Sequence, residues 1–277
     1  MSSSRVALVT GASSGIGRAA ALALRDAGWT VVATARRAEA LKEIEGPRLH
    51  TAVLDVTDEG SRAATAAAVE AQHGPVALLV NNAGFGRMGP IEEFPVADWE
   101  RLFATNVFGL VRMTQLVIPG MRSVGRGRII NVGSMGGEFT TPLAGAYHAS
   151  KYAVESISDA LRAEVKPFGL SVVVLQPGPV ATPLATDGDF VSDQDGPYAA
   201  AVEHMQEVAR EIKPGRGVLT PERVARTIVK IAGADRVSDR YQVGAVAHAL
   251  PFMRRWLPSG LWDRTMSRQS GLHLITG

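Results

Sequence analysis

Two side chains that could exchange a proton lie one helical turn apart near the middle of the chain. Tyr147 and Lys151 occur in a stretch that predicts a buried helix running to about Lys166, and residues four apart lie over one another on one helical face. An ammonium about 4 Å from a phenol favours the phenolate by roughly 4 kcal/mol at an intermediate dielectric. We therefore expect the pKa of Tyr147 to fall toward neutrality, which would make it a general acid or base. A half-buried aromatic followed by a solvated lysine is the simpler explanation of this spacing taken alone.

Two other polar side chains occupy positions from which they could serve the same reaction. Ser134 directly follows a predicted strand at 127–132, at the carboxyl end where open parallel sheets bind ligands. Asn106 lies within an apolar helical segment at about 96–121, where a buried amide needs a hydrogen-bonding partner or a water. Ser134 is thus either a cleft-facing hydroxyl or a turn residue, and Asn106 is either structural or part of a proton path.

A glycine-rich turn joins the first predicted strand, at 6–9, to the first predicted helix, at 18–27. Gly11 permits a tight turn, Gly15 lets a phosphate approach backbone N–H groups, and Gly17 lets the helix pack close to the strand. The helix N-terminus then faces the anion. This context predicts dinucleotide binding by the glycines and by the other residues of the turn, Ser13, Ser14 and Ile16.

The end of the second predicted strand, at 29–35, indicates which dinucleotide is bound. Arg36 and Arg37 stand there, at the place where a carboxylate would accept the ribose hydroxyls of NAD. A guanidinium instead pairs with the additional phosphate of NADP. NADP(H) is therefore the expected cofactor, unless the two arginines only open an exposed helix.

The ends of the next two predicted strands also carry candidate cofactor contacts. A strand at 49–54 is followed by Asp55 and Val56, and Asp55 is either an adenine contact or a helix N-cap. The strand at 75–80 is followed by Asn81, Asn82, Ala83 and Gly84, where small residues allow a sharp turn beside an adenosine and its phosphates.

Further strands are predicted at 170–175 and 241–243. The alternation of strands and helices along the chain predicts an α/β domain with a doubly wound parallel sheet of about seven strands and helices on both faces.

Composition argues against several other classes of function. The 277 residues include no Cys, and the six His show no metal-ligand spacing, so we expect no metal site. A net charge of +2 without a Lys/Arg block disfavours nucleic acid as a partner. No continuous apolar run reaches the roughly 18 to 20 residues of a membrane span, and the N-terminal residues lead directly into a strand. We expect a soluble, cytoplasmic protein.

Two regions follow the last motif-bearing strand. Residues 183–220 are punctuated by Gly, Asp and Pro, which predicts a lid over a substrate cleft or a surface insertion. A helix is predicted at 221–231.

The tail, 246–277, mixes aromatic residues with arginines, a pattern typical of a helical extension of the domain at 1–245. It could cover the pocket rim, form a subunit interface or contact a membrane peripherally.

Taken together, the motifs resemble those of the short-chain dehydrogenase/reductase family. The resemblance spans about residues 5 to 245 and rests on the order of Thr10 to Gly17, Asn81 to Gly84, Asn106, Ser134, Tyr147-x-x-x-Lys151, and Pro177 and Gly178 followed by Thr182. It implies a single-domain Rossmann fold, nicotinamide hydride transfer and a homodimer or homotetramer. The tail, with Tyr241 to Gly244 and Trp256 to Pro258, looks similar to those of members near the 17β-hydroxysteroid and retinol dehydrogenases.

The resemblance also implies a role for each residue. Tyr147 is implied to be the catalytic acid or base, and Lys151 lowers its pKa and binds the nicotinamide ribose. Ser134 holds the substrate oxygen, and Asn106 anchors a water for proton relay. Thr182 holds the nicotinamide carboxamide in a cofactor loop that includes Pro177, Gly178 and Val180.

The expected function is NADP(H)-dependent oxidation or reduction of a hydrophobic ketone or secondary alcohol, such as a steroid, retinoid or other lipid-like carbonyl. Apolar residues near the expected cleft support it: Phe85, Met88, Phe139, Leu184 and Phe190. Two alternatives stay open. One is a reductase of a small polar or acyl-carrier-linked ketone, and the other is a non-catalytic NADP(H)-binding redox sensor.

Overall fold

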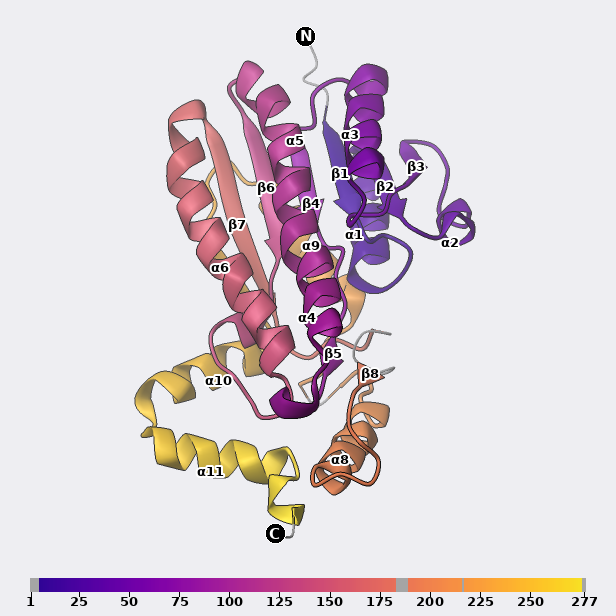
Figure 1. Cartoon of the computed structure of the whole chain (residues 1–277). Helices are drawn as coiled ribbons and strands as arrows, with labels where there is room; N and C mark the ends of the chain where they lie inside the picture. The colour runs from indigo at the N-terminus through magenta and orange to yellow at the C-terminus, as the bar shows by residue number, and fades with distance from the viewer. Residues whose placement is uncertain (1–4, 183–188, 216, 276–277) are drawn as a thin grey trace.

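Seven parallel strands form the central sheet, in the order β3-β2-β1-β4-β6-β7-β9 (Figure 1). The computed structural model describes residues 5–182, 189–215 and 217–275. The strands are β1 (Val6–Thr10), β2 (Thr30–Ala35), β3 (Leu49–Val53), β4 (Leu78–Asn81), β6 (Gly127–Val132), β7 (Leu170–Pro177) and β9 (Arg240–Val243). The predicted doubly wound α/β fold with about seven strands is confirmed.

Helices cover both faces of this sheet and bury its apolar strands. The side chains of β1 and β4 are fully buried, as expected for parallel strands covered on both sides. On one face, α1 (Gly15–Asp26) packs against α9 (Pro221–Gly233). On the other face lie α3 (Glu59–His73), α5 (Leu110–Ser123) and α6 (Gly145–Val165). A short α2 (Ala38–Lys42) follows β2.

The strand register brings the ends of successive strands to one edge of the sheet. Thr10 of β1 pairs with Thr34 of β2, and Asn81 of β4 pairs with Asn131 of β6. Because all strands run in the same direction, the loops that leave their carboxyl ends gather along this edge, the lower one in Figure 1. Every strand-end motif found in the sequence therefore meets its neighbours there.

The long helical stretch predicted at 96–121 has three parts. It consists of α4 (Val96–Phe103), a π-helical segment (Ala104–Gly109) and α5. By length and composition alone these 28 residues could cross a membrane, because the most apolar 18-residue window has a mean hydropathy of 1.3. However, 44% of that window is buried inside the protein, and α5 packs on the sheet and on α3. Its apolar character is thus that of a core helix.

The region predicted to be a lid contains a helix that the sequence pattern does not reveal. Residues 183–188 and 216 lie outside the described part of the chain, and so does the predicted cleft residue Leu184. The rest includes α8 (Ala199–Arg210) and a two-residue strand, β8 (Asp189–Phe190), paired in parallel with β5 (Arg87–Met88). The Arg87 guanidinium donates to the Asp189 carboxylate at 2.6 Å across this pair.

Two helices, α10 (Ala245–Trp256) and α11 (Ser259–Gln269), make up most of the tail. Trp262 and Met266 of α11 are buried against Phe139, with Leu250 of α10 beside them. This packing fixes the tail to the loop that follows β6. Short 3₁₀ segments complete the chain at Ile91–Glu93, Met135–Gly137, Lys166–Phe168 and Leu272–Leu274.

The close packing of α1 on the strand ends predicts the effect of one methyl group. A Cβ at Gly17 would overlap the Gly11 carbonyl oxygen and the Asn82 side-chain amide. We expect Gly17→Ala to lower the free energy of unfolding by about 1 to 3 kcal/mol, the usual cost of overpacking. Urea unfolding measures the change.

Gly233→Ala is the matched control, because a Cβ there meets nothing within 4 Å at the end of α9. It should leave stability unchanged or raise it slightly. Equal stabilities of the two variants would contradict the packing described for Gly17.

Candidate active site

Two cavities adjoin at the carboxyl edge of the sheet. The first has a volume of about 510 Å³ and lies over the ends of β1, β2, β3 and β4. The second, of about 330 Å³, lies beside the ends of β6 and β7 and is bounded further out by α8, α10 and α11. Both are lined by Ile16, Asn82, Gly84 and Thr182. They therefore form one continuous cleft, with these residues at the junction.

The first cavity contains the glycine-rich turn and the start of α1. Gly11 and Gly15 have positive φ angles of 68° and 54°, which side chains rarely adopt. Ser14 occupies the N-cap position of α1, yet its side chain makes no capping hydrogen bond. The first backbone N–H groups of α1 thus remain available to an anionic group.

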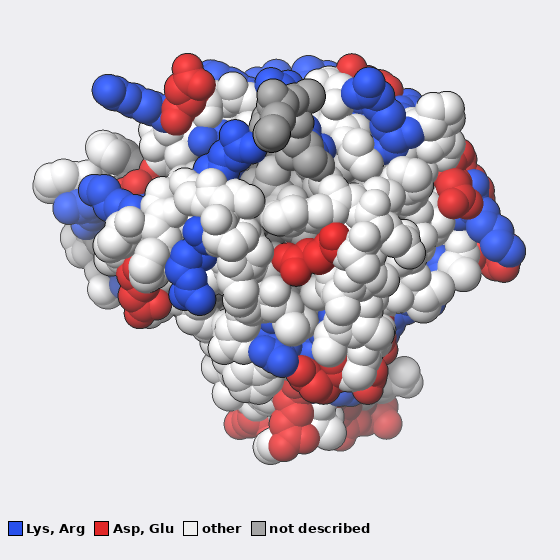
Figure 2. Space-filling view, turned by 90° about the horizontal axis from the view of Figure 1, so that it is seen from above, with Lys and Arg blue, Asp and Glu red and all other residues white. Residues whose placement is uncertain are grey.

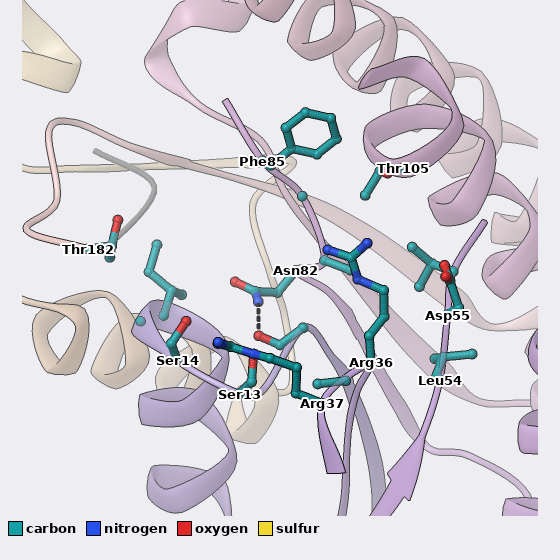
Figure 3. Close-up of a pocket in the computed structure, with 17 residues that line it drawn as sticks. Ser13, Ser14, Arg36, Arg37, Leu54, Asp55, Asn82, Phe85, Thr105 and Thr182 are labelled. Carbon is teal, nitrogen blue, oxygen red and sulfur yellow. Dashed lines mark hydrogen bonds between the residues drawn. The ribbon is translucent and has the colours of Figure 1, made fainter. Parts of the chain in front are cut away.

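An amide clamp holds this turn against the end of β4. The Asn82 side-chain nitrogen donates to the Thr10 and Gly11 carbonyl oxygens at 3.0 and 3.1 Å, and Figure 3 shows one of these bonds. In return, the Thr10 hydroxyl oxygen accepts from the backbone nitrogens of Asn82 and Ala83, both at 3.0 Å. The ends of β1 and β4 are therefore joined through side chains as well as through the sheet.

Arg36 and Arg37 extend over the first cavity from the end of β2. Figure 3 shows the Arg37 guanidinium reaching toward Ser13 and Ser14, while Arg36 points toward Phe85. Within the described residues, neither guanidinium has a hydrogen bond or an ion pair. Both cations are exposed, so they can meet an anionic ligand without first breaking a hydrogen bond or an ion pair.

Asp55 faces the same cavity and also organises its own loop. One carboxylate oxygen accepts from the backbone nitrogen and the hydroxyl of Thr57 at 2.8 and 2.7 Å. The N-cap of α3 is Asp58, so Asp55 is not the cap that its position allowed. Burial alone would raise the pKa of Asp55, but the Thr57 hydrogen bonds and the charges of Arg36 and Arg62 hold it below its usual value.

In the second cavity, Ser134 and Tyr147 form a hydroxyl pair. Ser134 Oγ accepts from the Gly136 backbone nitrogen at 3.1 Å, which leaves its proton for the hydrogen bond between the Ser134 and Tyr147 side chains. Burial raises the pKa of Tyr147, and the bond with Ser134 offsets only part of that effect. The phenol is therefore protonated at neutral pH.

Lys151 is buried in the wall of the second cavity. Its Nζ donates to the Val132 carbonyl oxygen at 3.0 Å and lies 5.8 Å from the centre of the Tyr147 ring. Burial lowers the pKa of Lys151 to about 8, although the Glu155 carboxylate acts in the opposite direction. The expectation that Lys151 lowers the pKa of Tyr147 toward neutrality is wrong for this geometry, because burial raises that pKa and the opposing effect comes from the Ser134 hydrogen bond.

A polar network lies behind Lys151 and connects it to the far strand of the sheet. The Gln176 amide donates to Glu138 and Glu155 at 2.6 and 2.9 Å. Arg240 of β9 donates to the other oxygen of Glu155 at 2.9 Å and forms an ion pair with Asp159 at 2.6 Å. Burial raises the pKa of Glu155 while the Gln176 bond and Arg240 lower it. The network fixes the helix that carries Tyr147 and Lys151.

Asn106 lies outside both cavities and is 2% exposed. Its amide oxygen accepts from the Phe85 backbone nitrogen, and its amide nitrogen donates to the Phe85 carbonyl oxygen, both at 3.0 Å. The same nitrogen donates to Ser150 Oγ at 3.1 Å. The amide thus fixes the loop that leaves β4, and only one lone pair of its oxygen is left for a water.

The structure brings most of the predicted cofactor residues together. The first cavity is lined by Gly11, Ser13, Ser14, Gly15, Ile16, Arg36, Arg37, Asp55, Val56, Asn82, Ala83, Gly84 and Thr182. The second is lined by Ser134, Tyr147, Lys151, Pro177, Gly178, Val180 and Thr182. Gly17 lines neither and serves the packing of α1. Of the apolar residues expected at the cleft, Met88, Phe139 and Phe190 line the second cavity and Phe85 lines the first.

Several residues that line the second cavity belong to no sequence motif, so the sequence did not predict them as site residues. They are His148, Met205, Val208, Ala209 and Ile212, with Leu250, Met266 and Gln269 from the tail. His148 is 7% exposed, and its Nδ1 accepts from the Thr141 backbone nitrogen at 3.3 Å. Its spacing of three residues from Lys151 is a signal that the sequence contains, because residues three apart share a helical face.

The chain matches a family model and is similar to several known proteins. The family model described as short chain dehydrogenase matches residues 5–189. A short-chain dehydrogenase structure from Streptomyces avermitilis is 36% identical, with 97% of each chain covered and a TM-score of 0.81. A 3-ketodihydrosphingosine reductase of Bacteroides thetaiotaomicron is 34% identical over 93% of this chain and 94% of its own.

A third similar protein was solved with a nicotinamide cofactor. It is a variant of the actinorhodin polyketide ketoreductase with NADPH, 31% identical, with 87% of this chain and 95% of that chain covered and a TM-score of 0.74.

Burial of His148 predicts a pH dependence of stability. The pKa of His148 is lowered by burial to about 4 from 6.5. Between these values the unfolded chain binds a proton that the folded protein does not, so the free energy of unfolding falls as pH drops from 6.5 to 4. The expected slope is at most about 1.4 kcal/mol per pH unit, measured by urea unfolding at three pH values.

His148→Asn should flatten this slope and keep an acceptor for the Thr141 N–H group. His273→Asn, which removes an exposed histidine, should retain the slope of the wild type. Parallel profiles for wild type and His148→Asn would contradict the buried neutral imidazole.

Proposed function

The chain belongs to the short-chain dehydrogenase/reductase family, and from this premise we propose that it is an NADP(H)-dependent oxidoreductase acting on hydrophobic ketones or secondary alcohols. The observation that carries the proposal is the paired hydroxyls of Ser134 and Tyr147. They lie in an apolar cavity that opens directly onto the cavity of the glycine-rich turn.

The described residues fit a dinucleotide along the first cavity. The uncapped start of α1 suits the diphosphate, and Asp55 and Val56 lie where the adenine would bind. Arg36 and Arg37 would hold the additional phosphate of NADP.

The nicotinamide end of the dinucleotide would reach the junction with the second cavity. There Lys151 would hold the nicotinamide ribose, and Pro177, Gly178, Val180 and Thr182 would hold the ring itself. When bound, the cofactor supplies or accepts the hydride, while the protein orients the reactants and controls the proton.

Tyr147 is proposed to transfer that proton. Since burial raises its pKa, the phenol is protonated at neutral pH and can donate to the carbonyl oxygen of a ketone during reduction. Ser134 would hold the same oxygen by a second hydrogen bond. In the reverse reaction the phenolate would take the alcohol proton, and the nearby Lys151 ammonium would favour that charge.

The substrate side of the cleft favours an apolar molecule. Much of its wall is formed by large apolar side chains, namely Met88, Phe139, Phe190, Met205, Leu250 and Met266. Burying such surface stabilises a bound ligand by roughly 25 cal/mol per Å². The relative named 3-ketodihydrosphingosine reductase, by its name a reductase of a lipid ketone, supports the same class of substrate.

Replacing the proposed acid tests the mechanism. Tyr147→Phe should lower kcat for reduction of a hydrophobic ketone by about 10² to 10⁴, the usual contribution of a positioned acid or base. NADPH consumption is followed with a ketone that the wild type turns over.

Tyr152→Phe is the matched control on the same helix, since Tyr152 is 42% exposed and lies outside both cavities of the cleft. It should keep wild-type activity. Full activity of Tyr147→Phe would contradict the assigned role.

Cofactor choice is tested by removing the two exposed cations. The double variant Arg36→Gln/Arg37→Gln should weaken NADPH binding by about tenfold to a hundredfold, as expected for loss of hydrogen bonds to a charged group. NADH binding should change much less, because NADH lacks the phosphate. Isothermal titration measures both affinities.

Arg126→Gln, which replaces an exposed arginine directly before β6, serves as the control and should change neither affinity. Tighter binding of NADH than of NADPH by the wild type would overturn the choice of NADP(H).

A further inference from the structure

The outer face of α10 exposes aromatic side chains to solvent. Phe252 and Trp256 are 66% and 70% exposed, and their ring centres lie 6.3 Å apart. Met253 is 40% exposed beside them, and Ala249 lies on the same helical face by its spacing. We call these four residues the α10 ridge. A contiguous apolar patch of this kind marks an interaction surface more often than scattered apolar residues do.

Basic side chains line one side of the α10 ridge. By their spacing, His248 and Arg255 lie along the edge of the same helical face. Next to His248 is an open cavity of about 550 Å³ between α9 and the start of α10, lined also by Arg223, Arg226 and Lys230. Within the described residues, the charged groups of Arg223, Arg226, Lys230 and Arg255 form no ion pair or hydrogen bond.

The sequence of the two helices is unbalanced in charge. Together α9 and α10 hold five Lys or Arg residues and one acidic residue, Glu222. At the end of the molecule where the N-terminus lies, Figure 2 shows Lys and Arg mixed with Asp and Glu. The apolar ridge thus adjoins a strongly cationic region, whereas the opposite end has both signs.

The inner faces of the same helices form part of the cavity wall. Leu250 of α10 and Met266 and Gln269 of α11 line the second cavity. Figure 1 shows α10 and α11 beyond the carboxyl edge of the sheet, outside the body formed by the strands. Whatever contacts the α10 ridge therefore lies on the other side of a thin helical wall from the proposed substrate cavity.

We propose that the α10 ridge and the cationic cavity beside it hold the protein peripherally on an anionic membrane surface. Phe252 and Trp256 enter the interface between head groups and acyl chains, and Arg223, Arg226, Lys230 and Arg255 contact lipid phosphates. Apolar residues on one strip of a helix with cations at its edge are the pattern of an interfacial helix. The proposal requires no catalytic activity, so it can fail or hold independently of the proposed function.

Charge complementarity favours a membrane over a second copy of this chain. Pairing two α10 ridges face to face would bring the Arg255 side chains and the cationic cavities of both copies near one another. Like charges at such an interface are unfavourable. An anionic bilayer neutralises all of them at once.

Vesicle co-sedimentation tests the proposal with the full chain. The probes are vesicles of phosphatidylcholine alone and vesicles with about 30% phosphatidylglycerol. We expect binding to the anionic vesicles at 0.1 M NaCl, at least about tenfold weaker binding to the neutral ones, and loss of binding at 1 M NaCl as the charges are screened.

Two variants separate the apolar and the cationic contributions. Phe252→Ser/Trp256→Ser and, separately, Arg223→Gln/Arg226→Gln/Lys230→Gln should each weaken binding to anionic vesicles by about tenfold or more. Thermal unfolding checks that each variant is folded.

Matched controls remove similar groups elsewhere on the surface. Val53→Ser/Val96→Ser replaces side chains that are 57% and 72% exposed, and Arg5→Gln/Arg126→Gln/Lys166→Gln removes three exposed cations. Both controls should bind as the wild type does.

Three results would overturn the proposal. They are no binding of the wild type to anionic vesicles, an equal loss of binding in the controls, and a change of oligomeric state in Phe252→Ser/Trp256→Ser measured by light scattering. The last result would assign the α10 ridge to contact between copies of the chain.

Discussion

The clamp between Thr10 and Asn82 is the contact on which the cleft depends. It ties the end of β1 to the end of β4, and it requires α1 to come so close that Gly17 has no room for a side chain. Both cavities include Asn82 in their walls. A ligand that spans the two cavities is therefore positioned by one set of hydrogen bonds, and the uncapped start of α1 is directed at it.

Burial determines the charge states on the other side of that junction. It raises the pKa of Tyr147 and lowers that of Lys151 to about 8. The phenol is therefore neutral, and the Lys151 ammonium beside it loses its proton more readily than an exposed lysine does. The Glu155 carboxylate, itself fixed by Gln176 and Arg240, opposes the effect of burial on Lys151. Arg240 of β9 thus acts on the charge of Lys151 only through the position of the Glu155 carboxylate.

Patterns that act over short distances made much of the fold predictable from the sequence. Apolar runs bounded by Gly, Asn or Asp located the seven strands, and the parallel arrangement brought Ser134, Asn82 and Asp55 to one edge. Contacts between distant segments were not predictable: β5 pairs with β8 across about a hundred residues, and α8 has a weak pattern rich in alanine. The Lys151 side chain donates to the Val132 carbonyl oxygen, and helical spacing does not indicate this partner.

Hydride transfer between a nicotinamide and an apolar carbonyl is the activity proposed for this cleft. The most direct measurement is deuteride transfer from NADPH deuterated at the reactive C4 position to long-chain ketones, with the products analysed by mass spectrometry. The expected product is an alcohol that carries deuterium at the former carbonyl carbon. Tight binding of NADPH with no deuterium transferred to any ketone of the series would contradict it and would favour a cofactor-binding sensor.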